Sequence, residues 1–145
     1  MTELERLIAV DELQRLKALY CRYADAKAWP ELGQLFTPNG EARFYDPGGR
    51  LVFAASSPDI GTAVGDRIGA AQPIHHIFSN ELTVWSPTEA EGLWAMEDLV
   101  VFPDGVPGPF RKMHGFGHYH ETYERHGGRW LIRSLALTRL RIEIE

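Results

Sequence analysis

The stretch that decides the fold is residues 112–142, KMHGFGHYHETYERHGGRWLIRSLALTRLRI. It contains two long runs with β-branched and aromatic content, 112–125 and 129–142, which are separated only by His126-Gly-Gly. Runs of this composition predict strands, and so short a connection favours an antiparallel hairpin. Two similar runs, 74–85 and 91–102, precede it. The second half of the chain is therefore expected to form a meander of four long strands.

The first forty residues have helical spacing instead. Apolar residues recur every three or four positions from about Asp11 to Lys27, and Asp11 with Gln14 has the pattern of a capping box. Leu4, Leu7 and Ile8 are then expected in a separate leading turn or short helix. Pro30 is placed for the first turn of a second short helix, which is expected to stop before Gly40.

Residues 41–69 combine a turn with a weaker helical pattern. Asp46-Pro-Gly-Gly49 lies between short apolar runs and predicts a hairpin. Ser57-Pro58 is suited to the start of a third helix, in which Gly61, Gly65 and Gly69 would allow close approach to a neighbour. Helices followed by long strands indicate an α+β fold in which a curved, mostly antiparallel sheet wraps around about three helices.

Length and composition limit the possible classes of protein. A chain of 145 residues fits one domain, 1–145, with a single core. The formal charge is −5 and the 15 Lys and Arg are scattered, so no nucleic acid partner is expected. No apolar stretch approaches the roughly 20 residues of a membrane span, and neither membrane insertion nor export is expected. The lone Cys21 argues against a disulfide or a Cys-rich metal centre and fits a cytoplasmic protein.

Three segments carry a resemblance to a known family. They are Leu19–Gly40, His75-His-Ile-Phe-Ser-Asn80 and Gly117–Trp130. In this order they resemble the SnoaL-like proteins of the nuclear transport factor two superfamily, and the likeness covers nearly the whole chain. The resemblance implies a cone-shaped sheet closed by helices around an internal pocket. The superfamily includes scytalone dehydratase, ketosteroid isomerase, polyketide cyclases, a dehydrochlorinase and non-catalytic binding modules, so it implies a fold rather than one reaction.

The resemblance also points to an acid–base pair. The aspartate that matches Asp25 points into the pocket in scytalone dehydratase and in the dehydrochlorinase, and His76 corresponds to the family's pocket histidine. Since adjacent strand residues face opposite sides, only one of His75 and His76 can enter the cone, and the sequence leaves that choice open. Simple alternation gives His76 the same face as Ile74, Phe78, Asn80, Leu82 and Val84. A carboxylate beside an imidazole suits proton abstraction near neutral pH, whereas a solvated helix end and a core histidine are the structural alternatives.

The other candidate site residues are polar groups on predicted strands and the long helix, together with aromatic residues. Asp98 shares a face with Trp94, Met96 and Val100, unless a bulge turns it to solvent. Tyr20, Tyr23 or Tyr45 is expected to donate a hydrogen bond to a developing oxyanion. The remaining substrate-binding candidates are Phe36, Phe78, Trp94, Phe110, His118 and Glu121. Glu121 stands where scytalone dehydratase has a second histidine, which argues against dehydration by that enzyme's mechanism.

Metal and cofactor chemistry has less support. His114, His118 and His120 are close in sequence but lack an obvious third ligand on one face, so no metal site is expected. The absence of a Gly-rich nucleotide loop argues against a dinucleotide cofactor. Arg133 and Arg139 could hold an anionic substrate group but are expected at the surface or in an interface.

These patterns support one functional hypothesis and one alternative. The hypothesis is a cofactor-independent lyase, isomerase or cyclase that uses an Asp–His pair on a mostly apolar or polycyclic small molecule. The alternative is a non-catalytic binding or assembly module of the same fold. Apolar residues on both faces of 91–102 predict a homodimer or homotrimer formed through the outer sheet face.

Overall fold

A long helix, α1 (Glu3–Asp25), opens the chain in the computed structural model, which describes residues 1–145. Thr2 accepts a hydrogen bond from the Glu5 amide and donates its own amide to the Glu5 side chain, which completes a capping box. The predicted start at Asp11 is therefore wrong. Asp11 instead pairs with Arg15 one helical turn later, at 2.9 Å, so Leu4, Leu7 and Ile8 belong to the same helix.

Two shorter helices and a β-hairpin follow α1. Helix α2 (Trp29–Gly33) has Pro30 in its first turn, as the sequence predicts, and strand β1 (Phe36–Tyr45) begins earlier than expected. It pairs with β2 (Leu51–Ser56) in the predicted hairpin, and helix α3 (Ile60–Ile68) follows. A Cβ atom on Gly65 would lie 2.5 Å from the Trp29 ring, so the glycine is what allows α3 to pack this closely against α2.

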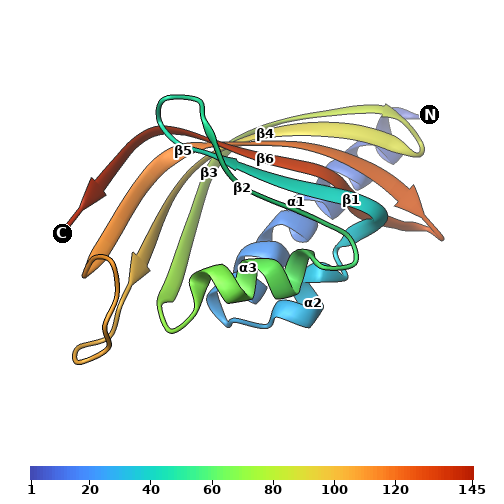
Figure 1. Cartoon of the computed structure of the whole chain (residues 1–145). Helices are drawn as coiled ribbons and strands as arrows, with labels where there is room; N and C mark the ends of the chain where they lie inside the picture. Colours follow the sequence, from blue (N-terminus) through green and yellow to red (C-terminus); the bar gives the residue numbers. More distant parts are fainter.

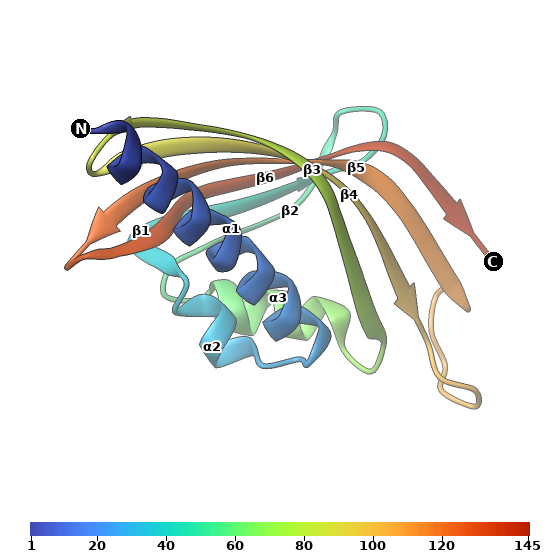
Figure 2. The same ribbon diagram turned by 180° about the vertical axis from the view of Figure 1, so that it is seen from behind.

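Four long strands complete the sheet, which confirms the expected meander. They are β3 (Gln72–Ser86), β4 (Glu89–Val101), β5 (Lys112–His126) and β6 (Arg129–Ile144). The strand order is β2-β1-β6-β5-β4-β3, and only the β1–β6 pair is parallel. The sheet arches over the helices, with α1 running across its concave face and α2 and α3 below one end (Figures 1 and 2). The α+β fold, with six strands around three helices, is the one that the sequence predicts.

β-Bulges bend the sheet and change which residues face inward. Three residue steps of β3, from Ile77 to Asn80, lie opposite only two steps of β4, from Met96 to Trp94. One extra residue reverses the alternation, so odd-numbered residues face the core before this bulge and even-numbered residues face it afterwards. Strand β6 has two similar shifts. These irregularities decide which polar side chains reach the interior.

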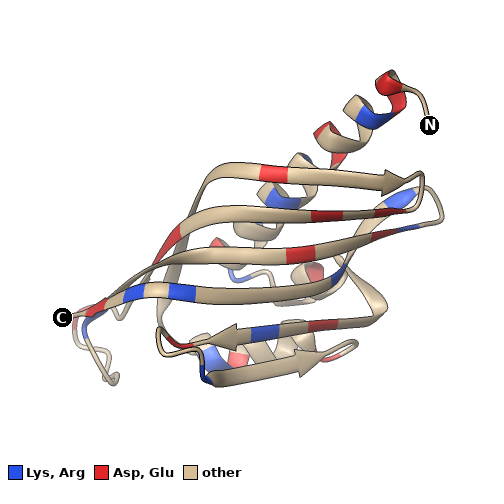
Figure 3. Ribbon diagram, turned by 90° about the horizontal axis from the view of Figure 1, so that it is seen from above, with Lys and Arg blue, Asp and Glu red and all other residues tan.

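The concave face and α1 share one hydrophobic core, which includes Leu13, Leu16, Trp94, Ile132 and Leu135. Lys and Arg residues are scattered among Asp and Glu along the helices and strands (Figure 3). None of the helices is long and apolar enough to cross a membrane.

Candidate active site

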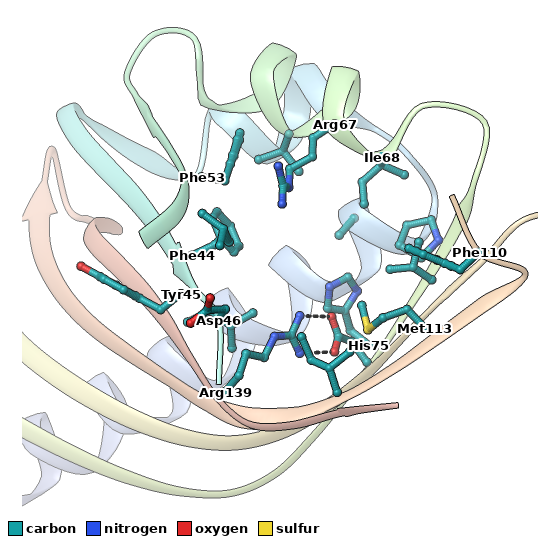
Figure 4. A pocket seen from close by; sticks show the side chains of 18 of the residues that line it. Phe44, Tyr45, Asp46, Phe53, Arg67, Ile68, His75, Phe110, Met113 and Arg139 are labelled. Atoms are coloured by element: carbon teal, nitrogen blue, oxygen red, sulfur yellow. Dashed lines mark hydrogen bonds and ion pairs between the residues drawn. The ribbon is translucent and has the colours of Figure 1, made fainter. Parts of the chain in front are cut away.

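A cavity of about 580 Å³ lies between the concave face of the sheet and the helices. Seventeen of its 24 lining residues are hydrophobic, and the lining comes from all three helices, all six strands, the β1–β2 turn and the loop between β4 and β5. A cavity of this size and character is typical of small-molecule sites. Figure 4 shows the few polar side chains that enter it, including His75, Arg139 and Arg67.

An Asp–His pair lies beside the cavity, but its histidine is His75, which lines the wall, whereas its partner Asp25 lies behind it and does not line the cavity as the resemblance implies. The His75 Nδ1 atom lies 2.7 Å from Asp25 Oδ1, and the His75 backbone amide is 3.4 Å from Asp25 Oδ2. Asp25 is the last residue of α1, and His75 lies near the start of β3. Because an ionised carboxylate can only accept, the neutral form of the ring carries its proton on Nδ1 and keeps the lone pair of Nε2 free. The His75 side chain is only 12% exposed, so the ring is largely shielded from water.

The predicted pairing of Asp25 with His76 is wrong. His76 lies on the outer face of the sheet, where its Nδ1 is 2.9 Å from Glu97 Oε1. His114 binds the other oxygen of Glu97 at 3.0 Å. Simple alternation carried back from Leu82 and Val84 assigns His76 to the interior, but the bulge between Ile77 and Asn80 reverses that assignment.

Asp98 faces the interior, as its apolar neighbours on β4 predict. It is 5% exposed and is the cross-strand neighbour of His75. Arg139 binds both carboxylate oxygens, with Nη1–Oδ1 at 2.5 Å and Nη2–Oδ2 at 2.9 Å. Burial disfavours the guanidinium cation, but the hydrogen bonds and charge of Asp98 outweigh burial and raise the pKa of Arg139. Asp98 is thus an ionic partner fixed in place rather than a free carboxylate.

Arg139 is a pocket residue that the sequence analysis assigned to the surface. It continues the face of the buried Leu135 and Leu137, and this alternation is the pattern that indicates its position. Gly115 supplies a second indication, because a Cβ atom there would lie 2.2 Å from Arg139 Nη1 and 2.6 Å from Asp98 Oδ1. A glycine inside a strand often marks such a close approach.

Two tyrosines offer hydroxyl groups next to the pair. Tyr20, a predicted residue, and Tyr119, which the sequence analysis did not single out, both line the cavity. Their rings pack edge to face with centroids 6.0 Å apart, and the Tyr20 and His75 centroids are 6.5 Å apart. Burial raises the pKa of both hydroxyls well above the ordinary value of 10.0, so they remain neutral donors. Tyr45 also lines the cavity, whereas Tyr23 does not.

Glu121 and Trp94 do not contact the cavity. Glu121 is 2.5 Å from Lys17 Nζ and accepts a 2.6 Å hydrogen bond from the Tyr123 hydroxyl, which itself accepts one from Trp94 Nε1. The charged groups of Lys17 and Glu121 are almost completely buried, and each neutralises the other, since a charge in an apolar core needs a partner. Lys17 Nζ also lies 3.3 Å from the centre of the Tyr119 ring. The network therefore contacts Tyr20 and Tyr119 through Lys17 without lining the cavity itself.

The other predicted substrate-binding residues divide between wall, core and surface. Phe110 lines the cavity, and Phe36 is buried in the core against Tyr20. Phe78 is 56% exposed, and His118 is on the outer face of β5, opposite to Tyr119. No group of three His, Cys, Asp or Glu side chains is arranged to hold a metal ion. His114 instead contacts Glu97, and His120 contacts Thr138.

Residues 5–136 match the SnoaL-like domain, and the chain belongs to this family. The probable cyclase FGR4 of Gibberella zeae is 29% identical over 137 residues, covering 88% of this chain and 89% of that protein. A scytalone dehydratase-like protein from Novosphingobium aromaticivorans superposes with a TM-score of 0.83 at 20% identity, covering 99% of this chain and 92% of its own. The type 2 hexachlorocyclohexane dehydrochlorinase LinA gives 0.79 at 16% identity, covering 99% and 93%. At these identities the two structures show a shared fold.

Proposed function

We propose that this protein is a cofactor-independent acid–base enzyme, a lyase, isomerase or cyclase, that acts on a mostly apolar small molecule. The observation that carries the proposal is the 2.7 Å contact between His75 Nδ1 and Asp25 at the wall of an apolar cavity. The names of the relatives, a cyclase, a dehydratase-like protein and a dehydrochlorinase, support the same broad class. The alternative, a non-catalytic module, predicts a cavity without a paired acid and base.

In this proposal, His75 Nε2 removes a proton from a carbon next to a carbonyl group. The electron pair of the broken C–H bond moves onto the carbonyl oxygen, and the Asp25 carboxylate stabilises the imidazolium that forms. The electron pair then moves back from the oxygen and the C=O bond re-forms. In an isomerisation of an unsaturated ketone another carbon takes the proton from the imidazolium, and in an elimination the bond from the β carbon to a leaving group breaks and the leaving group takes that proton. No separate nucleophile is needed for either outcome.

The developing oxyanion requires hydrogen-bond donors. Tyr20 and Tyr119 are neutral at physiological pH and line the cavity, so each can donate a hydrogen bond from its hydroxyl group to that oxygen. Arg139, which also lines the cavity, can add its remaining N–H donors in the same region, while Asp98 balances its charge and fixes its position. Asp98 therefore acts as a positioning residue, because Arg139 occupies both of its oxygens.

The two adjacent histidines give a matched test. A substrate is first found by screening cyclic ketones for proton exchange at carbon. We expect His75→Ala to lower turnover of that substrate by about 10²–10⁴-fold, the usual contribution of a general base. His76→Ala, on the outer face, should leave turnover unchanged. Equal rates for the wild type and His75→Ala would contradict the mechanism.

We also propose that the protein forms a homodimer or homotrimer through the outer sheet face. Large apolar side chains remain exposed in the monomer, among them Phe78, Trp85 and Leu140. Burial of such residues is a common driving force for association. Sedimentation velocity should show a dimer or trimer at micromolar concentration, and a monomer at all concentrations would contradict this proposal.

A further inference from the structure

Arg67 differs from the other charged residues that line the cavity. Asp98 and Arg139 form an ion pair, and Asp46 accepts a 2.9 Å hydrogen bond from the Arg50 amide. Arg67 makes no hydrogen bond or ion pair within the protein, and its guanidinium carbon lies 5.0 Å from the centre of the Phe53 ring. Figure 4 shows Arg67 pointing into the cavity, with His75 and Arg139 at the opposite wall.

The packing of α3 fixes the direction in which Arg67 points. Gly61 and Gly65 allow one side of α3 to lie against Trp29, since a Cβ atom on either glycine would collide with it. Val64, Arg67 and Ile68 are three and four residues apart, so they share another side of the helix, and all three line the cavity. The Phe53 ring supports the guanidinium further, as stacking on aromatic faces is favourable for arginine. Arg67 is therefore held at the cavity by the fold.

We infer that Arg67 binds the carboxylate of an aromatic substrate whose apolar body fills the cavity. A guanidinium group offers two parallel N–H donors that match a carboxylate, and the Arg67 guanidinium makes no hydrogen bond or ion pair within the protein, only a contact with the Phe53 ring. The mostly hydrophobic lining fits an aromatic body. The positions of Arg67 and His75 on opposite walls then require the carboxylate to be remote from the reacting carbon. This inference rests on the proposed function, since it specifies the substrate class of the same site.

Equilibrium binding tests the inference without turnover. The probes are 2-naphthoate and its neutral analogue 2-naphthamide, titrated by calorimetry into the wild type and Arg67→Gln. We expect the wild type to bind the carboxylate about tenfold more tightly than the amide, as one charge-assisted contact at an exposed arginine allows. Arg67→Gln should bind the two probes equally, and 0.5 M NaCl should weaken only carboxylate binding to the wild type.

Two control variants separate the possible failures. Arg43→Gln removes an exposed arginine of β1 that does not line the cavity, and it should keep the wild-type preference. His75→Ala should also keep the preference, so a failure of the proposed catalysis would leave this result intact. The inference is overturned if 2-naphthoate does not bind the wild type, if it binds no more tightly than the amide, or if Arg67→Gln retains the preference.

Discussion

The two faces of β3 place the same residue type in two different environments. His75 faces the cavity and contacts Asp25, whereas His76 faces outward and contacts Glu97. Both pairs have hydrogen-bond geometry, with distances of 2.7 and 2.9 Å. The inner ring is 12% exposed and the outer ring 55%, so only the inner pair combines a fixed tautomer with a sheltered space for a substrate. An imidazole–carboxylate contact therefore indicates catalysis only together with its surroundings.

The largest expected effect is a loss of turnover when the carboxylate of the inner pair, Asp25, is replaced by an amide. Asp25→Asn should lower turnover by about 10²–10⁴-fold. The amide can donate a hydrogen bond to Nδ1, which favours the tautomer with its proton on Nε2, and a neutral amide no longer stabilises the imidazolium. Glu97→Gln is the matched change on the outer face and should leave turnover unaltered. Steady-state kinetics on both variants tests this difference, and equal losses would show that the inner pair has no special role.

Buried and exposed ion pairs should also differ in how much they contribute to the free energy of unfolding. Lys17→Met should lower the free energy of unfolding by about 3–5 kcal/mol, because it leaves Glu121 buried without its cation. The double variant Lys17→Met/Glu121→Gln should recover much of this loss. Arg15→Ala, which breaks the exposed pair with Asp11, should cost about 0.5 kcal/mol or less. Urea denaturation measures all three, and a Lys17→Met cost as small as that of Arg15→Ala would contradict the contrast.

Deletion of one residue tests the role of the bulge. Removing Ser79 leaves Ile77, Phe78 and Asn80 opposite three consecutive residues of β4, so both faces of β3 keep their assignment. We expect a loss of about 1 kcal/mol, with the His75–Asp25 contact retained. Removing Thr83 instead turns the buried Val84 outward and should be far more damaging. Thermal melts compare the two deletions, and similar losses would show that the bulge is not the cause of the reversal.

The smallest expected effect concerns pH. Hydrogen bonds from His76 and then His114 hold the pKa of Glu97 below its ordinary value of 4.5. A carboxylate with a lowered pKa in the folded state contributes stability above its unfolded pKa, and this contribution disappears as the pH falls through the folded value. The Tm of the wild type should therefore fall slightly more steeply than that of Glu97→Gln below about pH 4.5. Parallel curves for the two proteins would contradict the shift.

Local sequence patterns determined most of the fold. The runs after residue 72 have the composition of strands, and the turns His126-Gly-Gly and Asp46-Pro-Gly-Gly49 fix which neighbours pair. The inward direction of Asp98 also followed from alternation, because β4 pairs with its neighbours without a bulge along the stretch that contains it. Helix spacing located α1 but not its start, since the capping box at Thr2 lies outside the apolar pattern of residues 11–27.

Only the tertiary structure decided the composition of the candidate site. A bulge adds one residue to a strand without a distinctive sequence pattern, and it exchanges the faces of all residues on one side of it. This is why His75 rather than His76 meets Asp25. The positions of Arg139 and Lys17 depend on partners 41 and 104 residues away in the chain. Burial of a charge is favourable only when such a partner is present, and the sequence by itself does not show which distant residues meet.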